Sequence, residues 1–222
     1  DVGQGLSVLL QTPNHQMLFD TGTASAAQRV VMPTLSAYGI KSLDQLLLSV
    51  PDQQQMGGMQ AITERLKVRQ ISGSFEDTQI KIQPCAAGQT WTWDGVVFER
   101  LAPWPEETQM DRRELSCVLR VTTAPNVLGQ RHRVLVMGGA GQLTEQMLRL
   151  LCVDLQADLL ILGQGKTANS VDFVQVVQPR YAVWSAARVK PNEQQKIEEI
   201  KQLGIQVDQT GLAGTLAYQL GG

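Results

Sequence analysis

The sequence predicts an α/β fold, an αββα sandwich in which two packed mixed sheets carry helices on both outer faces. The first observation is that the chain is β-rich at first and then alternates strand-like and helix-like patterns, twice over. The second is its composition: 43% of the 222 residues are hydrophobic and 18% are charged, which suits a globular protein with a sizeable core. The third is the lack of any linker-like shift in composition, which predicts a single domain over residues 1–222.

The first half of the chain is expected to be mainly strand. A turn over residues 12–15 separates two strand-like runs and predicts a hairpin. Leu43–Val50 is mostly apolar, as in a strand buried on both faces. The expected elements are, in order, strands Leu6–Gln11 and Gln16–Asp20, a helix Ala26–Tyr38, a strand Leu43–Val50, a helix Met56–Leu66, and strands Val68–Gly73, Gln79–Gln83 and Trp91–Leu101, the last with a turn at Asp94-Gly95.

The second half is expected to alternate more regularly. A proline- and charge-rich stretch, Ala102–Leu115, predicts an exposed loop before it. The helix that ends at Leu203 is followed by Gly204, a common residue at helix C-termini. The expected elements are, in order, strands Cys117–Thr123 and Arg133–Met137, a helix Leu143–Leu155, a strand Ala157–Leu162, a helix Val171–Val177, a strand Tyr181–Ser185, a helix Asn192–Leu203, and short strands Gln206–Gln209 and Thr215–Gln219.

Charge and cysteine content exclude several classes of protein. Nineteen Lys and Arg against 21 Asp and Glu give a net charge of −2, which excludes a strongly basic nucleic-acid coat but leaves a local basic patch possible. The three cysteines lack a Cys-x-x-Cys spacing, which predicts neither a disulfide framework nor a zinc ribbon. Cys117 and Cys152 lie in apolar runs and are expected to be small core residues. The only histidines, His15 and His132, are expected to face solvent.

The chain shows neither a membrane span nor a secretion signal. No stretch approaches the ~18 consecutive apolar residues of a spanning helix. The sequence starts Asp1-Val2-Gly3, inside the expected first strand and without a basic or apolar leader. We therefore expect a domain excised from a longer protein.

Asp20-Thr21-Gly22 follows an apolar strand and matches the local signature of aspartic proteases. That chemistry needs two carboxylates that share a proton, and the chain holds no second copy of the motif. A dimeric protease would therefore rest on Asp20 alone. The favoured interpretation is that Asp20 caps the turn or the helix that follows it.

A polar loop over residues 49–58 follows the buried strand Leu43–Val50. The carboxyl ends of such strands are where α/β proteins place their sites. This loop offers one carboxylate, three glutamines and no histidine. By itself it predicts only a polar turn that enters a helix through Gly57-Gly58.

Taken in order along the chain, these motifs resemble one family. DVGQG, LFDTG, SxPDxxxxGG, SCVLR and a glycine-rich turn after Val136 resemble the metallo-β-lactamase-like domain at the C-terminal end of ComEC-type competence proteins. The run from Cys85 to Phe98, CxAGQxWxWDGVxF, resembles the proteobacterial members. The family consists of inner-membrane channels that import DNA during natural transformation. The resemblance therefore implies three things: a domain of a bacterial inner-membrane protein, the membrane channel portion of the same parent chain as a partner, and single- or double-stranded DNA as a second partner.

The resemblance also implies where metal ligands would fall. The His and Asp positions of the family's Ser-His-x-Asp-x-Asp-His loop, its bridging Asp, its His-His pair and its late His fall on Val50, Asp52, Gln54, Gln55, Gly139, Gly163, Gln164 and Lys190. The Asp that follows DVGQG in the family is Leu6 here. Only Asp52 keeps an anionic donor, and neutral amides are weak ligands. We therefore expect the family's zinc or manganese to be lost and no other cofactor to be bound.

The leading hypothesis is a non-catalytic domain that is structural or guides DNA. The alternative is residual metal-dependent nuclease or phosphodiesterase activity on incoming DNA. Candidate DNA contacts are Lys166, Arg188 and Lys190, with Arg131 and Arg133 nearby. If Lys190 points into the pocket, its charge opposes a cation there. Binding is expected to be weak, non-specific and strongly dependent on salt.

Overall fold

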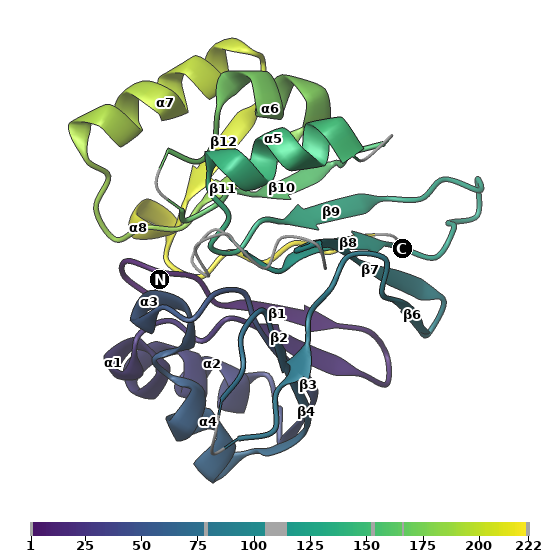
Figure 1. Ribbon diagram of the computed structural model, residues 1–222, viewed down its shortest axis with the longest axis vertical. Coiled ribbons are helices and arrows are strands. Elements are labelled where there is room, and N and C mark those ends of the chain that lie inside the picture. Colours follow the sequence, from purple (N-terminus) through teal and green to yellow (C-terminus); the bar gives the residue numbers. More distant parts are fainter. Residues whose placement is uncertain (1, 78–79, 105–114, 152–153, 166, 221–222) are drawn as a thin grey trace.

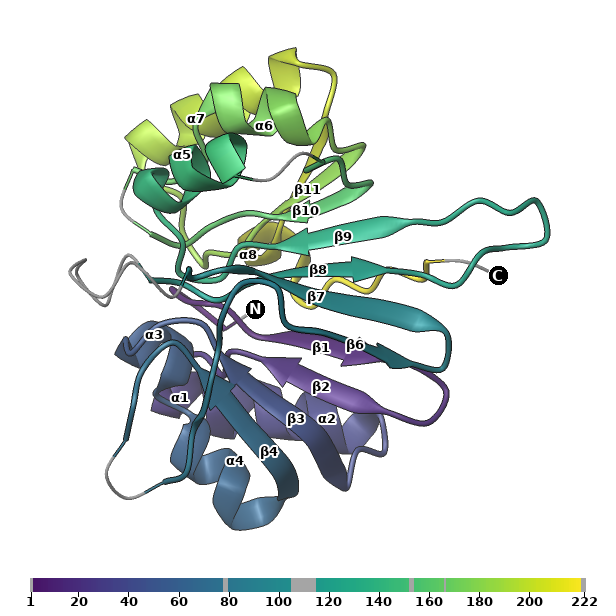
Figure 2. The ribbon, with the colours of Figure 1, turned by 45° about the vertical axis from the view of Figure 1, so that its right-hand side comes forward.

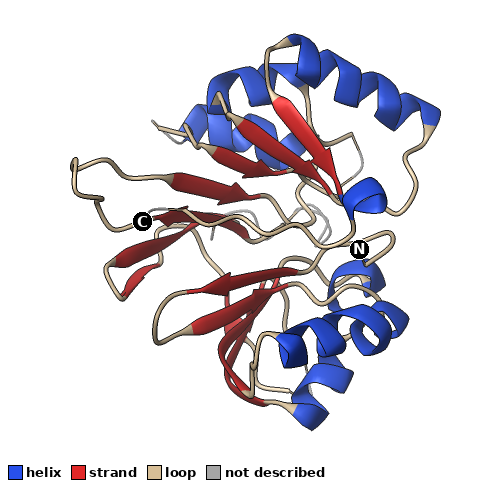
Figure 3. Ribbon diagram, turned by 180° about the vertical axis from the view of Figure 1, so that it is seen from behind, coloured by secondary structure: helices blue, strands red, loops and turns tan. Residues whose placement is uncertain are grey.

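Two mixed sheets lie face to face, and helices cover the outer face of each (Figures 1 and 3). The structure is a computed structural model and describes residues 2–77, 80–104, 115–151, 154–165 and 167–220. The first sheet has the strand order β1-β2-β3-β4-β5 and the second β12-β11-β10-β9-β8-β7-β6. The predicted αββα sandwich is therefore confirmed.

The first half of the chain forms the five-stranded sheet and its helices. Its elements are β1 Val8–Gln11, β2 Gln16–Phe19, α1 Ala24–Ala26, a π-helical turn Ala27–Val31, α2 Met32–Ala37, β3 Ser42–Leu48, α3 Gln53–Met56, α4 Met59–Arg65, β4 Lys67–Gly73 and β5 Gln83–Pro84. Strand β1 pairs with β2 antiparallel, and the other strand pairs are parallel.

The second half forms the seven-stranded sheet. Its elements are β6 Thr90–Trp93, β7 Val96–Ala102, β8 Val118–Thr122, β9 Arg133–Val136, α5 Gln142–Leu151, β10 Leu159–Ile161, α6 Val171–Val177, β11 Tyr181–Trp184, α7 Pro191–Gln202, β12 Gln206–Gln209 and α8 Thr210–Ala213. Strands β9 to β12 run parallel, and β6 to β9 form an antiparallel meander. The connection from β8 to β9 extends well beyond the rest of the molecule (Figure 2).

Three apolar clusters fill the sandwich, and strand β3 shows how they arise. Leu47 points to the other sheet and joins the cluster between the sheets. Its neighbours Leu46 and Leu48 point the opposite way and pack in the cluster that includes residues of α2 and α4. A third cluster lies where α5, α6 and α7 cover the second sheet. A strand that is buried on both faces explains the mostly apolar run that begins at Leu43.

Several element boundaries differ from the predictions. The helix expected over Met56–Leu66 is two short helices that meet at Gly57 and Gly58. Neither glycine has room for a side chain: a β-carbon at Gly57 would lie 2.4 Å from the Gln53 carbonyl oxygen, and one at Gly58 would lie 2.3 Å from Ala27 Cβ. The strand expected over Gln79–Gln83 is reduced to β5, with Gln79 outside the described residues. The loop expected over Ala102–Leu115 begins later, because Ala102 belongs to β7 and is buried; residues 105–114 lie outside the described part.

The strand expected over Thr215–Gln219 is wrong. This tail has no regular secondary structure and follows the short helix α8, which was not predicted. Leu216 and Leu220 pack against the cluster between the sheets, so the tail carries apolar residues without a strand partner. The apolar residues of this tail therefore reflect burial against the core and not pairing with a neighbouring strand.

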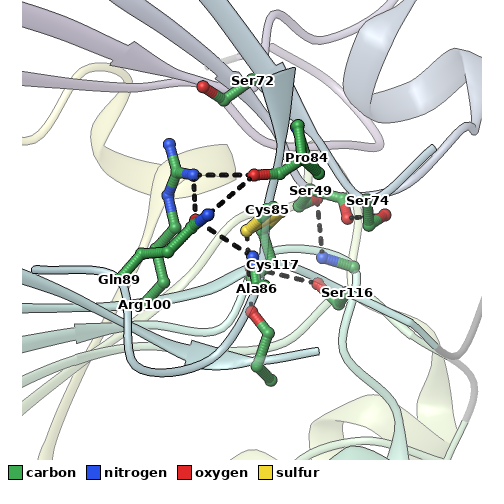
Figure 4. The surroundings of a disulfide bond; sticks show 12 residues. Ser49, Ser72, Ser74, Pro84, Cys85, Ala86, Gln89, Arg100, Ser116 and Cys117 are labelled. Carbon is green, nitrogen blue, oxygen red and sulfur yellow. Dashed lines mark hydrogen bonds between the residues drawn. A yellow bond between two sulfur atoms is a disulfide. The ribbon is translucent and has the colours of Figure 1, made fainter. Parts of the chain in front are cut away.

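The expectation for the cysteines is also wrong in part. Cys85 and Cys117 form a disulfide across 32 residues of sequence, with their Cα atoms 6.1 Å apart (Figure 4). Cys117 is buried, as expected, but as half of a bridge. The pairing arises from tertiary approach of β5 and β8, which no local spacing reports. Cys152 lies outside the described residues.

Candidate functional site

Loops from both halves of the chain meet where the parallel strands β3, β9, β10 and β11 end. The hydroxyl of Ser49, after β3, accepts a hydrogen bond from the Gly139 N–H at 3.0 Å. The Gln164 N–H donates to the Gly138 carbonyl at 2.8 Å. The Ser185 hydroxyl, after β11, donates to the Gly5 carbonyl at 2.8 Å. The structure thus brings the loops that carry the predicted ligand positions to one edge of the sandwich.

Val50 and Gly139 stand at the positions of the family's first His and bridging Asp, and the two residues pack directly against each other. Val50 is buried, with 3% of its surface exposed. A β-carbon at Gly139 would lie 2.4 Å from Val50 Cγ2, so no side chain larger than hydrogen fits there without movement. The Val50 methyl groups therefore occupy the space that a side chain at position 139 would need.

Asp52 is the one predicted ligand position that keeps a carboxylate, and the structure gives it another role. Its Oδ1 accepts a hydrogen bond from the Gln54 N–H at 2.9 Å, and Asp52 is the N-cap of α3. Gln54 is exposed, whereas Gln55 is buried. The Gln55 main-chain carbonyl accepts hydrogen bonds from the Thr21 N–H and hydroxyl. These residues build the turn that connects β3 to its helices.

Gly163 and Lys190 also place no donor in a pocket. The N–H of Gly163 donates to Asn169 Oδ1 at 2.9 Å, and a β-carbon there would lie 2.6 Å from the Ala140 carbonyl oxygen. Lys190 precedes α7 with 69% of its side chain exposed, and its Nζ lies 3.9 Å from Glu193 Oε1. The inward orientation considered for Lys190 is therefore wrong. Arg188 is exposed, and Lys166 lies outside the described residues.

Asp20 lies directly beneath this edge and is fully buried. Its carboxylate accepts hydrogen bonds from the Ser49 N–H and the Ser49 hydroxyl, each at 2.7 Å. Burial raises the pKa of Asp20 to about 8, although both hydrogen bonds from Ser49 oppose the shift. The prediction that Asp20 caps a turn or helix is wrong, because Thr23 caps α1. A single carboxylate without solvent contact also gives a protease substrate no access.

The donor set does not fit the metal pair that the family resemblance implies. Val50, Gly139 and Gly163 have no ligating side-chain atom, and Asp52 already caps a helix. In the described part of the chain, no three His, Cys, Asp or Glu side chains gather closely enough to hold a metal ion.

The two histidines lie away from this edge and are less exposed than predicted. His15 is half-buried, stacks on Trp93 with ring centroids 5.0 Å apart, and lies 3.3 Å from Asp94. His132 is half-buried, and its Nδ1 lies 3.6 Å from Asp158. Both rings contact residues far away in sequence, so the sequence pattern near each histidine does not predict these contacts.

Comparison with known proteins identifies the family. No family model matches the chain. Competence protein ComA of Neisseria gonorrhoeae is 37% identical over 228 residues, which cover 100% of this chain and 32% of that protein. Recombination protein 2 of Haemophilus influenzae is 31% identical over 199 residues, or 86% of this chain and 24% of that protein. The chain belongs to the ComEC-type competence proteins. It spans about a quarter to a third of the length of these relatives.

The fold of this competence-family chain is that of the metallo-β-lactamases. The metallo-β-lactamase fold protein YhfI of Bacillus subtilis superposes with a TM-score of 0.58, covering 92% of this chain and 88% of YhfI. At 16% identity that similarity establishes the fold alone. Within the described residues, none of the helices has both the length and the apolar character needed to cross a bilayer.

Proposed function

We propose that residues 1–222 form one non-catalytic metallo-β-lactamase-fold domain of a larger DNA-uptake protein of the bacterial inner membrane. The domain supports the channel portion of the parent chain or guides DNA past it. One observation carries the proposal: the Val50 side chain packs against Gly139, so apolar groups and backbone fill the place of the metal ligands. The membership in the competence family supports the DNA-uptake context.

The chemistry of hydrolysis supports the non-catalytic assignment. A two-metal site activates water and stabilises the reacting phosphate through the charge of its cations. Holding two cations requires several anionic or imidazole donors, and the predicted ligand positions offer one carboxylate, Asp52, which is engaged in a helix cap. Loss of a single supporting partner costs roughly 10–100-fold in metal affinity or activity, so loss of nearly all ligands removes the activity.

A limited role in guiding DNA is compatible with the charges at the same edge. Arg188 and Lys190 are exposed there, whereas Glu193 partly offsets Lys190 and Asp52 adds one negative charge. The whole chain carries a net charge of −2, so long-range attraction of DNA is small. We propose weak, non-specific binding, with Kd on the order of 10⁻⁴–10⁻⁶ M and a strong dependence on salt.

Transformation of cells that carry point variants tests the non-catalytic role. Asp52→Ser keeps a helix-capping side chain but removes the carboxylate, and Gln55→Ala removes the neighbouring amide. We expect both variants to transform at the wild-type frequency, whereas deletion of residues 1–222 lowers it strongly. Loss of transformation together with loss of a Mn²⁺- or Zn²⁺-dependent nuclease activity in Asp52→Ser would establish the residual-hydrolase alternative instead.

Fluorescence anisotropy with single-stranded DNA at low salt tests the DNA contact. The test variant changes Lys166, Arg188 and Lys190 to Ala, and we expect it to lose most of the binding. The matched control changes Lys41, Lys67 and Arg69 to Ala, which also removes three positive charges. These residues lie at the start of β3 and β4, at the end of the strands away from the ligand edge. Equal losses in both variants would show a diffuse charge effect and no guiding surface.

A further inference from the structure

The Cys85–Cys117 disulfide joins the two sheets beside the edge that carries the predicted ligand positions (Figure 4). Cys85 follows β5 of the first sheet, and its N–H donates to the Gly73 carbonyl at 2.8 Å. Cys117 precedes β8 of the second sheet, and its N–H donates to the Ser49 carbonyl at 2.9 Å. Ser49 is the residue before Val50. The bridge is therefore a covalent link between the two halves at the edge that carries the predicted ligand positions.

The segment that carries Cys85 is held in place independently of the sulfur atoms. The Arg100 guanidinium donates to the Pro84 carbonyl at 3.2 Å and to the Gln89 side-chain oxygen. The Gln89 side chain in turn donates to the Pro84 carbonyl and accepts from the Ala86 N–H (Figure 4). These contacts hold the segment around Cys85 in place, and its Cα–Cα distance to Cys117 lies inside the range of ordinary disulfides.

The burial of the pair indicates a structural bridge and not a redox-active one. Cys85 has 5% of its surface exposed and Cys117 has none. Catalytic and redox-sensing cysteines need an accessible thiol with a lowered pKa. Within the described residues no third metal-ligating side chain joins them, so a metal site does not explain the pair.

Structural disulfides persist in oxidising compartments and are rare in the bacterial cytosol, where thioredoxin and glutathione keep thiols reduced. We infer that the Cys85–Cys117 disulfide is formed in the working protein and that this domain therefore lies on the outer, periplasmic side of the inner membrane. The inference uses the membrane location in the proposed function but not the DNA contact or the lack of catalysis, so it can fail separately from them.

The oxidation step balances with a protein dithiol oxidase as the electron acceptor. The Cys85 and Cys117 thiols together lose two protons and two electrons as the S–S bond forms. Thiol–disulfide exchange passes the electrons to the disulfide of the oxidase, which becomes a dithiol. The exchange takes place during folding, before the two sulfur atoms are buried.

Mass spectrometry of the full-length protein from cells tests the bridge. Cells are quenched in acid, free thiols are alkylated under denaturing conditions, and the protein is digested with trypsin without reduction. Cleavage gives peptides 82–100 and 114–120, each with one cysteine. We expect them to be covalently linked in the wild type, and peptide 82–100 to be alkylated in the matched Cys117→Ser variant. Recovery of both wild-type peptides in alkylated form overturns the inference.

Labelling in spheroplasts tests the location without altering the bridge. Val127 lies in the projecting β8–β9 connection and is 97% exposed, so Val127→Cys supplies an accessible thiol far from both cysteines. A membrane-impermeant maleimide is expected to label this variant above the wild-type background before lysis. Labelling that appears only after lysis places the domain in the cytosol and overturns the inference even if the disulfide is present.

Discussion

The two ends of the sandwich are both tied from sheet to sheet, but by different means. At the ligand edge the ties are buried: the Asp20–Ser49–Gly139 hydrogen bonds, the packing of Val50 and the disulfide. At the opposite end the ties are exposed. There Asp94, in the β6–β7 turn, accepts hydrogen bonds from the Thr12 hydroxyl at 2.7 Å and from the Asn14 main-chain N–H at 2.9 Å.

The difference indicates which end is essential for stability. Buried polar groups and packed side chains cost much more to disrupt than solvent-exposed hydrogen bonds and ion pairs. Apolar contact, a buried hydrogen-bonded carboxyl group and a covalent bridge thus hold the ligand edge together. The opposite end needs only a surface turn contact.

At a fixed pH, removing the disulfide is expected to have the largest effect on stability. Closing a loop of 32 residues limits the unfolded chain, so Cys85→Ala with Cys117→Ala should lower the free energy of unfolding by about 3–4 kcal/mol. Urea denaturation measures the change. Reductant should lower the wild type to the same value and leave the double variant unaltered. Equal stability of oxidised wild type and double variant would show that the bridge does not tie the sheets.

The buried carboxyl group of Asp20 is expected to make stability depend on pH. The folded state holds the proton up to about pH 8, whereas the unfolded group releases it near its ordinary pKa of 3.8. Raising the pH between these values therefore favours unfolding, by at most about 1.4 kcal/mol per pH unit. Denaturation across pH 5–8 measures the slope, and Asp20→Asn should flatten it. A slope that persists in Asp20→Asn would assign it to another group.

The contact between Val50 and Gly139 is expected to show in a double-mutant cycle. Gly139→Ala places a β-carbon against Val50 and should cost about 1–3 kcal/mol of stability through overpacking. Val50→Ala makes room, so adding Gly139→Ala to Val50→Ala should cost much less. Thermal or urea unfolding of the four proteins gives the coupling. Additive effects would contradict direct packing of the two residues.

The smallest effect is expected at the exposed end. Hydrogen bonds from Asn14 and Thr12 hold the pKa of Asp94 well below its usual range. Its contribution is therefore present above the ordinary carboxyl pKa, near pH 4, and is lost as the pH falls below it. Asp94→Asn tolerates the left-handed backbone at φ 50° and should lower the unfolding midpoint less than any change above. A larger loss would reverse the ranking of the two ends.

Much of the fold could be predicted from periodicity, because most strands and helices bury a regular face. The errors fall where tertiary contact decides the local structure. Two short helices meet at Gly57 and Gly58, where Gly58 packs closely against Ala27, and the apolar tail at Leu216 lies against the core without joining a sheet. In both cases the sequence pattern indicates that the segment is buried but does not indicate which residues it packs against.

The candidate site could be located from the motifs but not understood from them. The ligand positions predicted at Val50 and Gly139 do meet at one edge, as the resemblance implied. The role of Asp20 depends on Ser49, a distant neighbour, and the roles of Asp52 and Lys190 depend on side-chain direction; local motifs predict neither. The disulfide was missed for the same reason, since 32 residues separate its halves.

Elemental analysis of the full-length protein, after incubation with Zn²⁺ and Mn²⁺ and removal of free metal, tests the central claim most directly. With apolar groups and backbone in place of the ligands, we expect bound metal well below one ion per chain, equal in the wild type and in Asp52→Ser with Gln55→Ala. One or two ions per chain, lost in that double variant, would contradict the account and restore the metal-dependent hydrolase as the function of this domain.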